Sequence, residues 1–119
     1  MSQELFRLSG LLASLACLWL FMVSSASSET ITVEILCRKS FYTPDIVRLK
    51  KGVPAKLVLR SADVTHGFAI DELNIAREVP PGPPVSIEFT PARAGQFTFY
   101  CVVRCGKDHL KMRGTLIVE

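Results

Sequence analysis

The sequence predicts an all-β domain, a sandwich or barrel of short strands, on two observations. From residue 31 onward apolar side chains recur at every second position, as in Ile31, Val33 and Ile35, which is the spacing of a half-buried strand. Turn-forming stretches rich in glycine and proline, such as residues 51–54, separate these segments. Helical periodicity is absent from this part of the chain, so we expect strands throughout.

Seven segments carry the strand pattern, and seven or eight strands at this spacing are typical of a sandwich. In chain order they are residues 31–37, 46–49, 57–59, 67–70, 85–89, 96–101 and 115–118. The proline-rich stretch at 80–84 is expected to be an exposed connection, because proline lacks the N–H that a sheet interior needs. No repeat or long linker divides the chain, so residues 27–119 are expected to form one domain.

The first 26 residues have the composition of a targeting segment. Residues 8–23 carry no charge, Glu4 and Arg7 precede them, and Ser24-Ser25-Ala26 follows at the usual cleavage spacing. We interpret residues 1–26 as a signal peptide cleaved after Ala26, and the alternative is a retained membrane anchor. Under either interpretation residues 27–119 reach the periplasmic or extracytoplasmic face of the membrane.

Composition excludes several classes of function. The net charge of +3 is spread along the strands and concentrated only once, around Arg104, Lys107, Lys111 and Arg113, which does not favour a nucleic-acid-binding protein. The sequence contains neither a phosphate-binding loop nor a nucleophile with a separate base. An enzyme acting alone is therefore not expected, and any oxidase activity would belong to a larger complex.

One short segment gathers side chains that bind metals. Cys101, Cys105, His109 and Met112 fall within twelve residues, and His66 supplies a further donor. Thiolates and thioethers are soft ligands and imidazole is intermediate, a mixture that favours copper, above all Cu(I). Both histidines of the chain, and its one methionine after residue 27, belong to this set.

The motifs at residues 63–68 (Asp-Val-Thr-His-Gly-Phe) and 101–114 (Cys-x3-Cys-Gly-x2-His-x2-Met-x-Gly) resemble the copper A domain of subunit II of haem-copper cytochrome c oxidases. The resemblance implies a cupredoxin-like Greek-key β-sandwich with a binuclear centre of two copper ions, which carries electrons without substrate chemistry. It also implies a set of metal ligands: His66, Cys101, the carbonyl of Val103, Cys105, His109 and Met112. In many oxidase subunits of this kind, electrons enter from cytochrome c through an exposed aromatic residue, often a tryptophan. Trp19, the only tryptophan, lies in the leader, so that route is in doubt here.

Three other functions remain open at this point. Copper storage or delivery to an oxidase would use the same donors. A structural zinc site could use the two cysteines and two histidines, although it would gain nothing from Met112. Thiol–disulfide exchange is disfavoured because three residues, rather than two, separate Cys101 from Cys105.

Two residues near the motifs receive structural interpretations. Cys37 continues the inward face of the first strand and is expected to be a buried apolar group rather than a ligand. Asp63 could orient His66, but an Asp in a turn more often bonds its own backbone, and we favour that role.

The expected partners are a redox protein that donates electrons and a haem-copper oxidase or other acceptor. Because basic residues dominate the segment 104–113, the donor is expected to be acidic or neutral.

Overall fold

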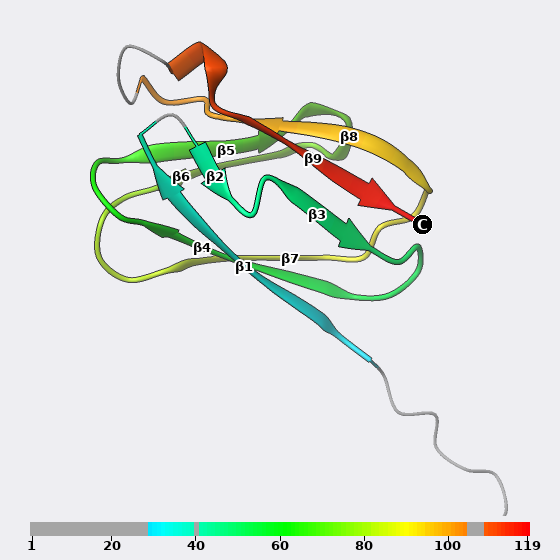
Figure 1. Ribbon diagram of the computed structural model, residues 1–119. Coiled ribbons are helices and arrows are strands. Elements are labelled where there is room, and N and C mark those ends of the chain that lie inside the picture. Colours follow the sequence, from blue (N-terminus) through cyan, green and yellow to red (C-terminus); the bar gives the residue numbers. More distant parts are fainter. Residues whose placement is uncertain (1–28, 40, 105–108) are drawn as a thin grey trace, which may run out of the picture.

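The computed structural model describes residues 29–39, 41–104 and 109–119. In this part of the chain nine strands form two sheets that pack face to face (Figure 1), so the predicted all-β sandwich is confirmed. The strands are β1 (Ile31–Arg38), β2 (Phe41–Thr43), β3 (Ile46–Leu49), β4 (Ala55–Ser61), β5 (His66–Ile70), β6 (Ile75–Val79), β7 (Val85–Phe89), β8 (Gly95–Tyr100) and β9 (Arg113–Val118). Two short 3-10 helices, η2 (Asp71–Leu73) and η3 (His109–Lys111), lie between strands.

The two sheets have the orders β2-β1-β4-β7 and β3-β9-β8-β5-β6. Strands β1 and β4 run parallel, as do β3 and β9, and the remaining pairs are antiparallel. Between β2 and β8 the chain crosses repeatedly from one sheet to the other, so strands that are consecutive in sequence often lie in different sheets. This topology brings β5, β8 and β9, which carry the predicted ligand motifs, into one sheet.

Two strands, β2 and β6, were not predicted, for different reasons. Strand β2 has only three residues. Strand β6 lies at the edge of its sheet and exposes three consecutive side chains, Ala76, Arg77 and Glu78. A strand such as β6, which is exposed to solvent on both faces, needs no alternation of apolar residues, so its sequence resembles that of a loop.

The core lies between the sheets and extends to the end of the sandwich that carries His66. Phe68, Phe99 and Tyr42 form an aromatic cluster there, with ring centroids 5.0 Å apart for Tyr42 and Phe99. The hydroxyl of Tyr42, on the four-stranded sheet, donates a hydrogen bond of 2.7 Å to the carbonyl of Gly67 on the five-stranded sheet. Tyr42 therefore ties the two sheets together one residue from His66.

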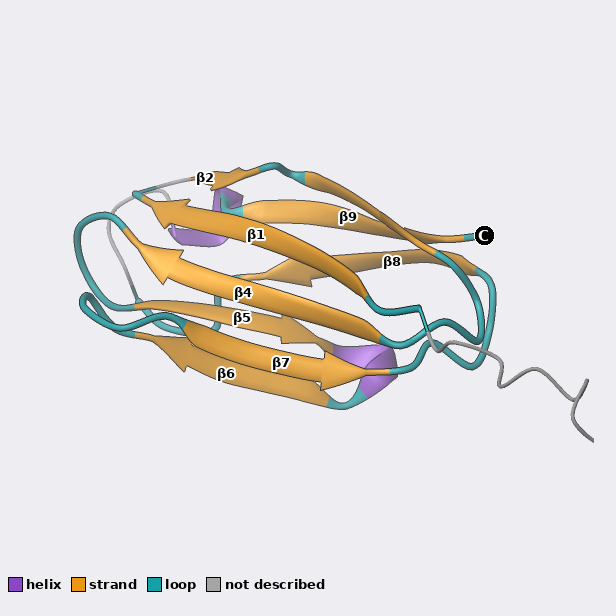
Figure 2. Cartoon of the chain, turned by 90° about the horizontal axis from the view of Figure 1, so that it is seen from below, coloured by secondary structure: helices purple, strands orange, loops and turns teal. Residues whose placement is uncertain are grey.

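Figure 2 shows that β1 and β4 end at the same end of the sandwich at which β5 and β9 begin. We call this the ligand end. The 1–26 segment lies outside the described residues, so its interpretation as a signal peptide or anchor remains an expectation. In the part of the chain that the structure describes, no helix is long and apolar enough to cross a bilayer.

Candidate metal centre

A short turn between β4 and β5 fixes His66 at the start of β5. The carboxylate of Asp63 accepts hydrogen bonds from two backbone amides, Val64 N at 2.7 Å and Lys39 N at 2.8 Å. The hydroxyl of Ser61 donates to the carbonyl of Val64 and closes the same turn. The Asp63 carboxylate therefore links this turn to the β1–β2 connection as well as to the strand that follows.

The imidazole of His66 is fully buried, and its two nitrogens have different surroundings. Nε2 lies 2.5 Å from Oδ1 of Asp63. Nδ1 is buried and has no hydrogen-bond partner among the described residues. Because an ionised carboxylate can only accept, Nε2 carries the proton, and a neutral ring then has its lone pair on Nδ1. A buried lone pair without a donor is costly, and a metal ligand is the common reason to keep one.

The pKa of Asp63 supports this assignment of the proton. Desolvation raises the pKa of the carboxyl group, but hydrogen bonds from Lys39 N–H, from the His66 ring and from Val64 N–H lower it more, to about 2. The carboxylate is therefore ionised at neutral pH. The expected role of Asp63 as a turn residue is confirmed, but the preference for it over orientation of His66 was wrong, because Asp63 does both.

Cys101 directly follows β8 and lies beside the start of β5. Its thiol is buried and accepts a hydrogen bond of 3.3 Å from Gly67 N. It also lies 2.9 Å from the carbonyl oxygen of Val103, to which it donates. The structure thus brings together Cys101 and Val103, two of the predicted ligands, next to the residue that follows His66. An N–H donor at a thiol also stabilises the thiolate that a metal requires.

Close backbone approach at this position requires a glycine. A Cβ built on Gly67 would lie 2.6 Å from Val102 N and 2.9 Å from Val103 N. Any side chain at position 67 would therefore push the ligand segment away from β5. Gly114 is also crowded, since a Cβ there would overlap the ring of Phe99.

Met112 is fully buried and lies directly before β9, and its carbonyl accepts a hydrogen bond of 3.3 Å from Cys101 N. Cys105 lies outside the described residues, and so does the side chain of His109, whose backbone begins η3. The part of the chain that the structure describes contains no cluster of three or more His, Cys, Asp or Glu side chains that could hold a metal. Of the predicted ligands, the structure describes His66, Cys101, the Val103 carbonyl and Met112 at the ligand end.

Two residues that support this site, Lys39 and Tyr42, were not predicted from the sequence; Tyr42 contributes its side chain. Its hydroxyl fixes the carbonyl of Gly67, and its ring packs edge-on against Phe68 at 6.0 Å. The only signal in the sequence was an aromatic residue shortly after the first strand, which is common in any β core. The burial expected for Cys37 is confirmed.

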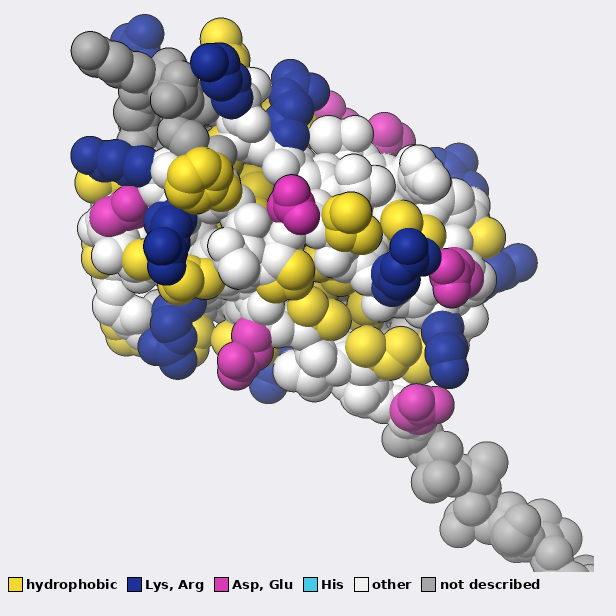
Figure 3. Space-filling view, in the orientation of Figure 1, with side chains coloured by type: hydrophobic (Ala, Val, Ile, Leu, Met, Phe, Trp, Pro, Cys, Tyr) yellow, Lys and Arg dark blue, Asp and Glu magenta, His cyan; other side chains and the backbone are white. Residues whose placement is uncertain are grey.

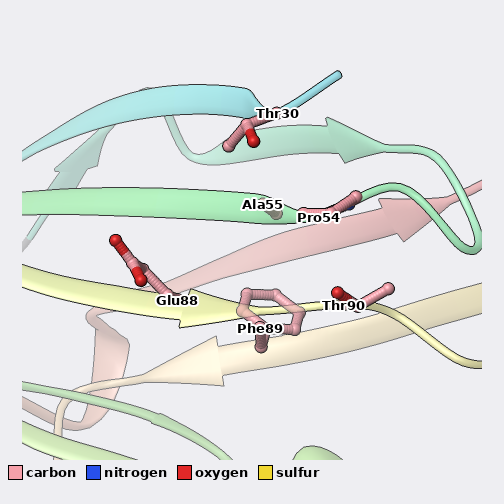
Figure 4. Close-up of a pocket in the computed structure, with 6 residues that line it drawn as sticks. All are labelled: Thr30, Pro54, Ala55, Glu88, Phe89 and Thr90. Carbon is pink, nitrogen blue, oxygen red and sulfur yellow. The ribbon is translucent and has the colours of Figure 1, made fainter. Parts of the chain in front are cut away.

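Two hollows in the described part of the chain contain no soft donors. One of about 360 Å³ lies at the opposite end of the sandwich and is lined by Thr30, Pro54, Ala55, Glu88, Phe89 and Thr90 (Figure 4). Another of about 370 Å³ is lined by Asp45, Ile46, Thr98, Arg113, Gly114 and Thr115. Each contains one carboxylate and no thiol or imidazole, so neither offers the ligands that copper prefers.

Comparison with known proteins agrees with this architecture. The family model of the cupredoxin-like domain matches residues 10–118. Cytochrome c oxidase subunit 2 of Thermus thermophilus is 33% identical over 88 residues, which cover 74% of this chain and 65% of that protein. Nitrous-oxide reductase of Cupriavidus necator is 36% identical over 97 residues, covering 78% of this chain but 15% of the enzyme. The match therefore spans less than two thirds of these relatives.

The solved periplasmic domain of cytochrome oxidase subunit II from Bradyrhizobium japonicum has the same fold. It superposes with a TM-score of 0.69 at 20% sequence identity, and the match covers 82% of this chain and 88% of that domain.

Proposed function

Because this chain belongs to the cupredoxin-like domain family and is homologous to the soluble domain of cytochrome c oxidase subunit II, we propose that it transfers electrons through a two-copper centre. The proposed ligands are His66, Cys101, the Val103 carbonyl, Cys105, His109 and Met112. The observation that carries this proposal is the buried Nδ1 of His66, which lacks a partner among the described residues while Asp63 holds the other nitrogen. The soft donors Cys101 and Met112, both buried at the same end, fit copper better than zinc.

When bound, copper would supply a site that accepts and returns one electron. The chain's own residues hold the donors in place. Asp63 fixes the ring of His66, Gly67 N–H holds the sulfur of Cys101, and Tyr42 holds the carbonyl of Gly67. Donor atoms that are held by hydrogen bonds within a packed core would move little when the charge of the bound metal changes. A small change in ligand positions favours fast electron transfer. The bonding pattern therefore suits a carrier.

Copper storage or delivery is the second candidate. That function requires donors that exchange metal with a partner, and exchange is easier when the donors are accessible. His66 and Met112 are fully buried, and Cys101 is 4% exposed. Burial of these three donors favours retention of the metal over exchange.

The proposed location and partners follow from the relatives. Subunit 2 of cytochrome c oxidase and the periplasmic domain from Bradyrhizobium japonicum are related in sequence or fold. We place this chain on the extracytoplasmic side, where a redox protein would donate electrons and a haem-copper oxidase would accept them. Residues 1–26 would serve as a signal peptide or anchor, and residues 27–119 would form the copper-binding domain.

Copper reconstitution followed by redox cycling tests the function. The chain is loaded with copper, cycled electrochemically and followed optically in the presence of a Cu(I) chelator. An electron carrier gives a reversible couple and retains its metal over many cycles. Rapid loss of copper to the chelator would contradict electron transfer and support delivery. A chain that binds zinc in preference to copper under the same conditions would contradict both.

A further inference from the structure

The ligand end presents a surface in which exposed apolar side chains are surrounded by cations. Val102 is 43% exposed and Leu110 is 78% exposed. Val102 lies against Gly67, because its Cγ2 atom is 2.5 Å from the position of a Cβ on that glycine. Leu110 directly follows His109 in η3. Each side chain is therefore both open to solvent and one residue from a proposed ligand.

The structure adds cations that the sequence did not associate with this site. Arg38 ends β1, and Lys39 follows it in the turn to β2; both are exposed. The Lys39 backbone donates to Asp63, which holds His66, so this turn belongs to the ligand end. Arg104 and Lys111 are also exposed, on the two sides of the loop between β8 and β9. Dark blue side chains gather at this end in Figure 3.

Among the described residues at or near this end, the acidic side chains are those of Asp63, Asp45 and Glu78. The carboxylate of Asp63 accepts two backbone hydrogen bonds and contacts His66. Asp45 lies to one side, where it lines a hollow together with Arg113. Glu78 lies on the edge strand β6, opposite Gly67 in the register. Arg113 lies at the border of this hollow and of the positive surface, because its Nε donates a hydrogen bond of 3.4 Å to the carbonyl of Leu110. The other cations of the positive surface are Arg38, Lys39, Arg104 and Lys111.

We propose that this surface docks an acidic redox protein, with Val102 and Leu110 at the centre of the contact and Arg38, Lys39, Arg104 and Lys111 around it. The inference rests on the proposed electron-transfer function and names the partner class for the same site. An apolar centre excludes water from the contact, while surrounding cations attract and orient a negatively charged partner. Because Val102 lies against the backbone that follows His66, docking there places the partner a short distance from the donors.

Charge reversal with a matched control tests the surface. Arg38→Glu/Arg104→Glu removes two cations from it, and Lys50→Glu/Lys51→Glu makes the same change in net charge at the far end, beside Glu119. The copper-loaded chain is mixed with an acidic two-iron ferredoxin or a basic cytochrome c over a range of salt concentrations. We expect the first double variant to slow association with the ferredoxin about tenfold at low salt, and the control to have little effect.

Amide chemical-shift mapping with the same probes provides a readout that does not depend on electron transfer. The ferredoxin is expected to shift the amides of Val102, Leu110 and Lys39. Equal slowing by both double variants would overturn the inference, and so would faster association of the basic cytochrome at low salt. A chain that lacks a copper spectrum but shows these shifts would contradict the proposed function and leave the docking surface supported. A redox-active chain without the shifts would contradict the surface alone.

Discussion

Asp63 and His66 form a contact of 2.5 Å in which Oδ1 of the carboxylate faces Nε2 of the ring, leaving Nδ1 buried without a partner among the described residues. The carboxylate therefore selects the nitrogen that remains available to a metal. Its second oxygen accepts from Lys39 N, so the orientation of the ring depends on the β1–β2 connection as well.

Replacement of Asp63 tests this orientation. Asp63→Ala removes both acceptors and is expected to weaken copper binding by about 10- to 100-fold, the usual effect of losing a group that orients a ligand. Asp63→Asn keeps one carbonyl oxygen and is expected to lose less. Competition titration against a copper chelator measures both affinities. Equal affinities for the wild-type chain and Asp63→Ala would show that the ring is held in place by packing alone.

The free energy of unfolding of the copper-free chain should depend on pH through the same carboxylate. In the folded chain the pKa of Asp63 is about 2, below the ordinary value of 3.8. A depressed pKa stabilises the fold above the ordinary value, and this contribution is lost as the pH falls from about 4 toward 2. The difference in unfolding free energy between wild type and Asp63→Asn should therefore shrink over that interval. Urea unfolding at a series of pH values measures it, and a constant difference would contradict the assignment.

Gly67→Ala tests the close approach of the ligand segment to β5. The new methyl group would overlap Val102 N and Val103 N, so Cys101 and Val103 would move away from His66. We expect most copper binding to be lost. Gly52→Ala is the control, because Gly52 has a φ of +78° but no atom near its Cβ position. That variant should lose about 1–2 kcal/mol of stability and keep its copper. Retention of full copper binding by Gly67→Ala would refute the steric argument.

The two buried cysteines should behave differently. Cys37 is fully buried, on the four-stranded sheet, and Cys37→Ala is expected to cost about 1 kcal/mol of stability without loss of copper. Cys101→Ser is expected to abolish the two-copper centre, because a hydroxyl replaces a soft anionic donor. Metal analysis together with thermal unfolding separates these effects. A copper deficit in Cys37→Ala would mean that Cys37 contributes to the site.

The fold was predictable where burial alternates along a strand. Leu57 and Leu59 point from β4 into the core, and the apolar residue at every second position predicted this strand. Strand β5 is buried at every position, so its prediction depended on the turn before His66 rather than on alternation. The exposed edge strand β6 gave no signal at all. Periodicity reports the difference between two faces of a strand, so it fails when both faces have the same environment.

The sequence indicated the chemistry proposed for the site but not the residues that support it. The mixture of soft donors favoured copper, and the family resemblance implied the full set of ligands. Lys39 and Tyr42 gave no such signal, since their contributions depend on contacts across 24 and 25 residues of sequence. The basic cluster predicted from the sequence was incomplete. Arg113 contacts the carbonyl of Leu110 and also lines a hollow with Asp45, while Arg38 and Lys39, at the end of β1 in the other sheet, add two cations. Contacts between residues this far apart in the sequence depend on the topology of the fold, which the local sequence pattern does not specify.

Paramagnetic resonance of the copper-loaded, oxidised chain, combined with metal analysis, tests the central claim most directly. The account predicts two copper ions per chain and a hyperfine pattern in which one unpaired electron is shared by both nuclei. The motivation is the pair of thiols, Cys101 and Cys105, each able to bridge two metals. One copper per chain with a hyperfine pattern from a single nucleus would contradict the account.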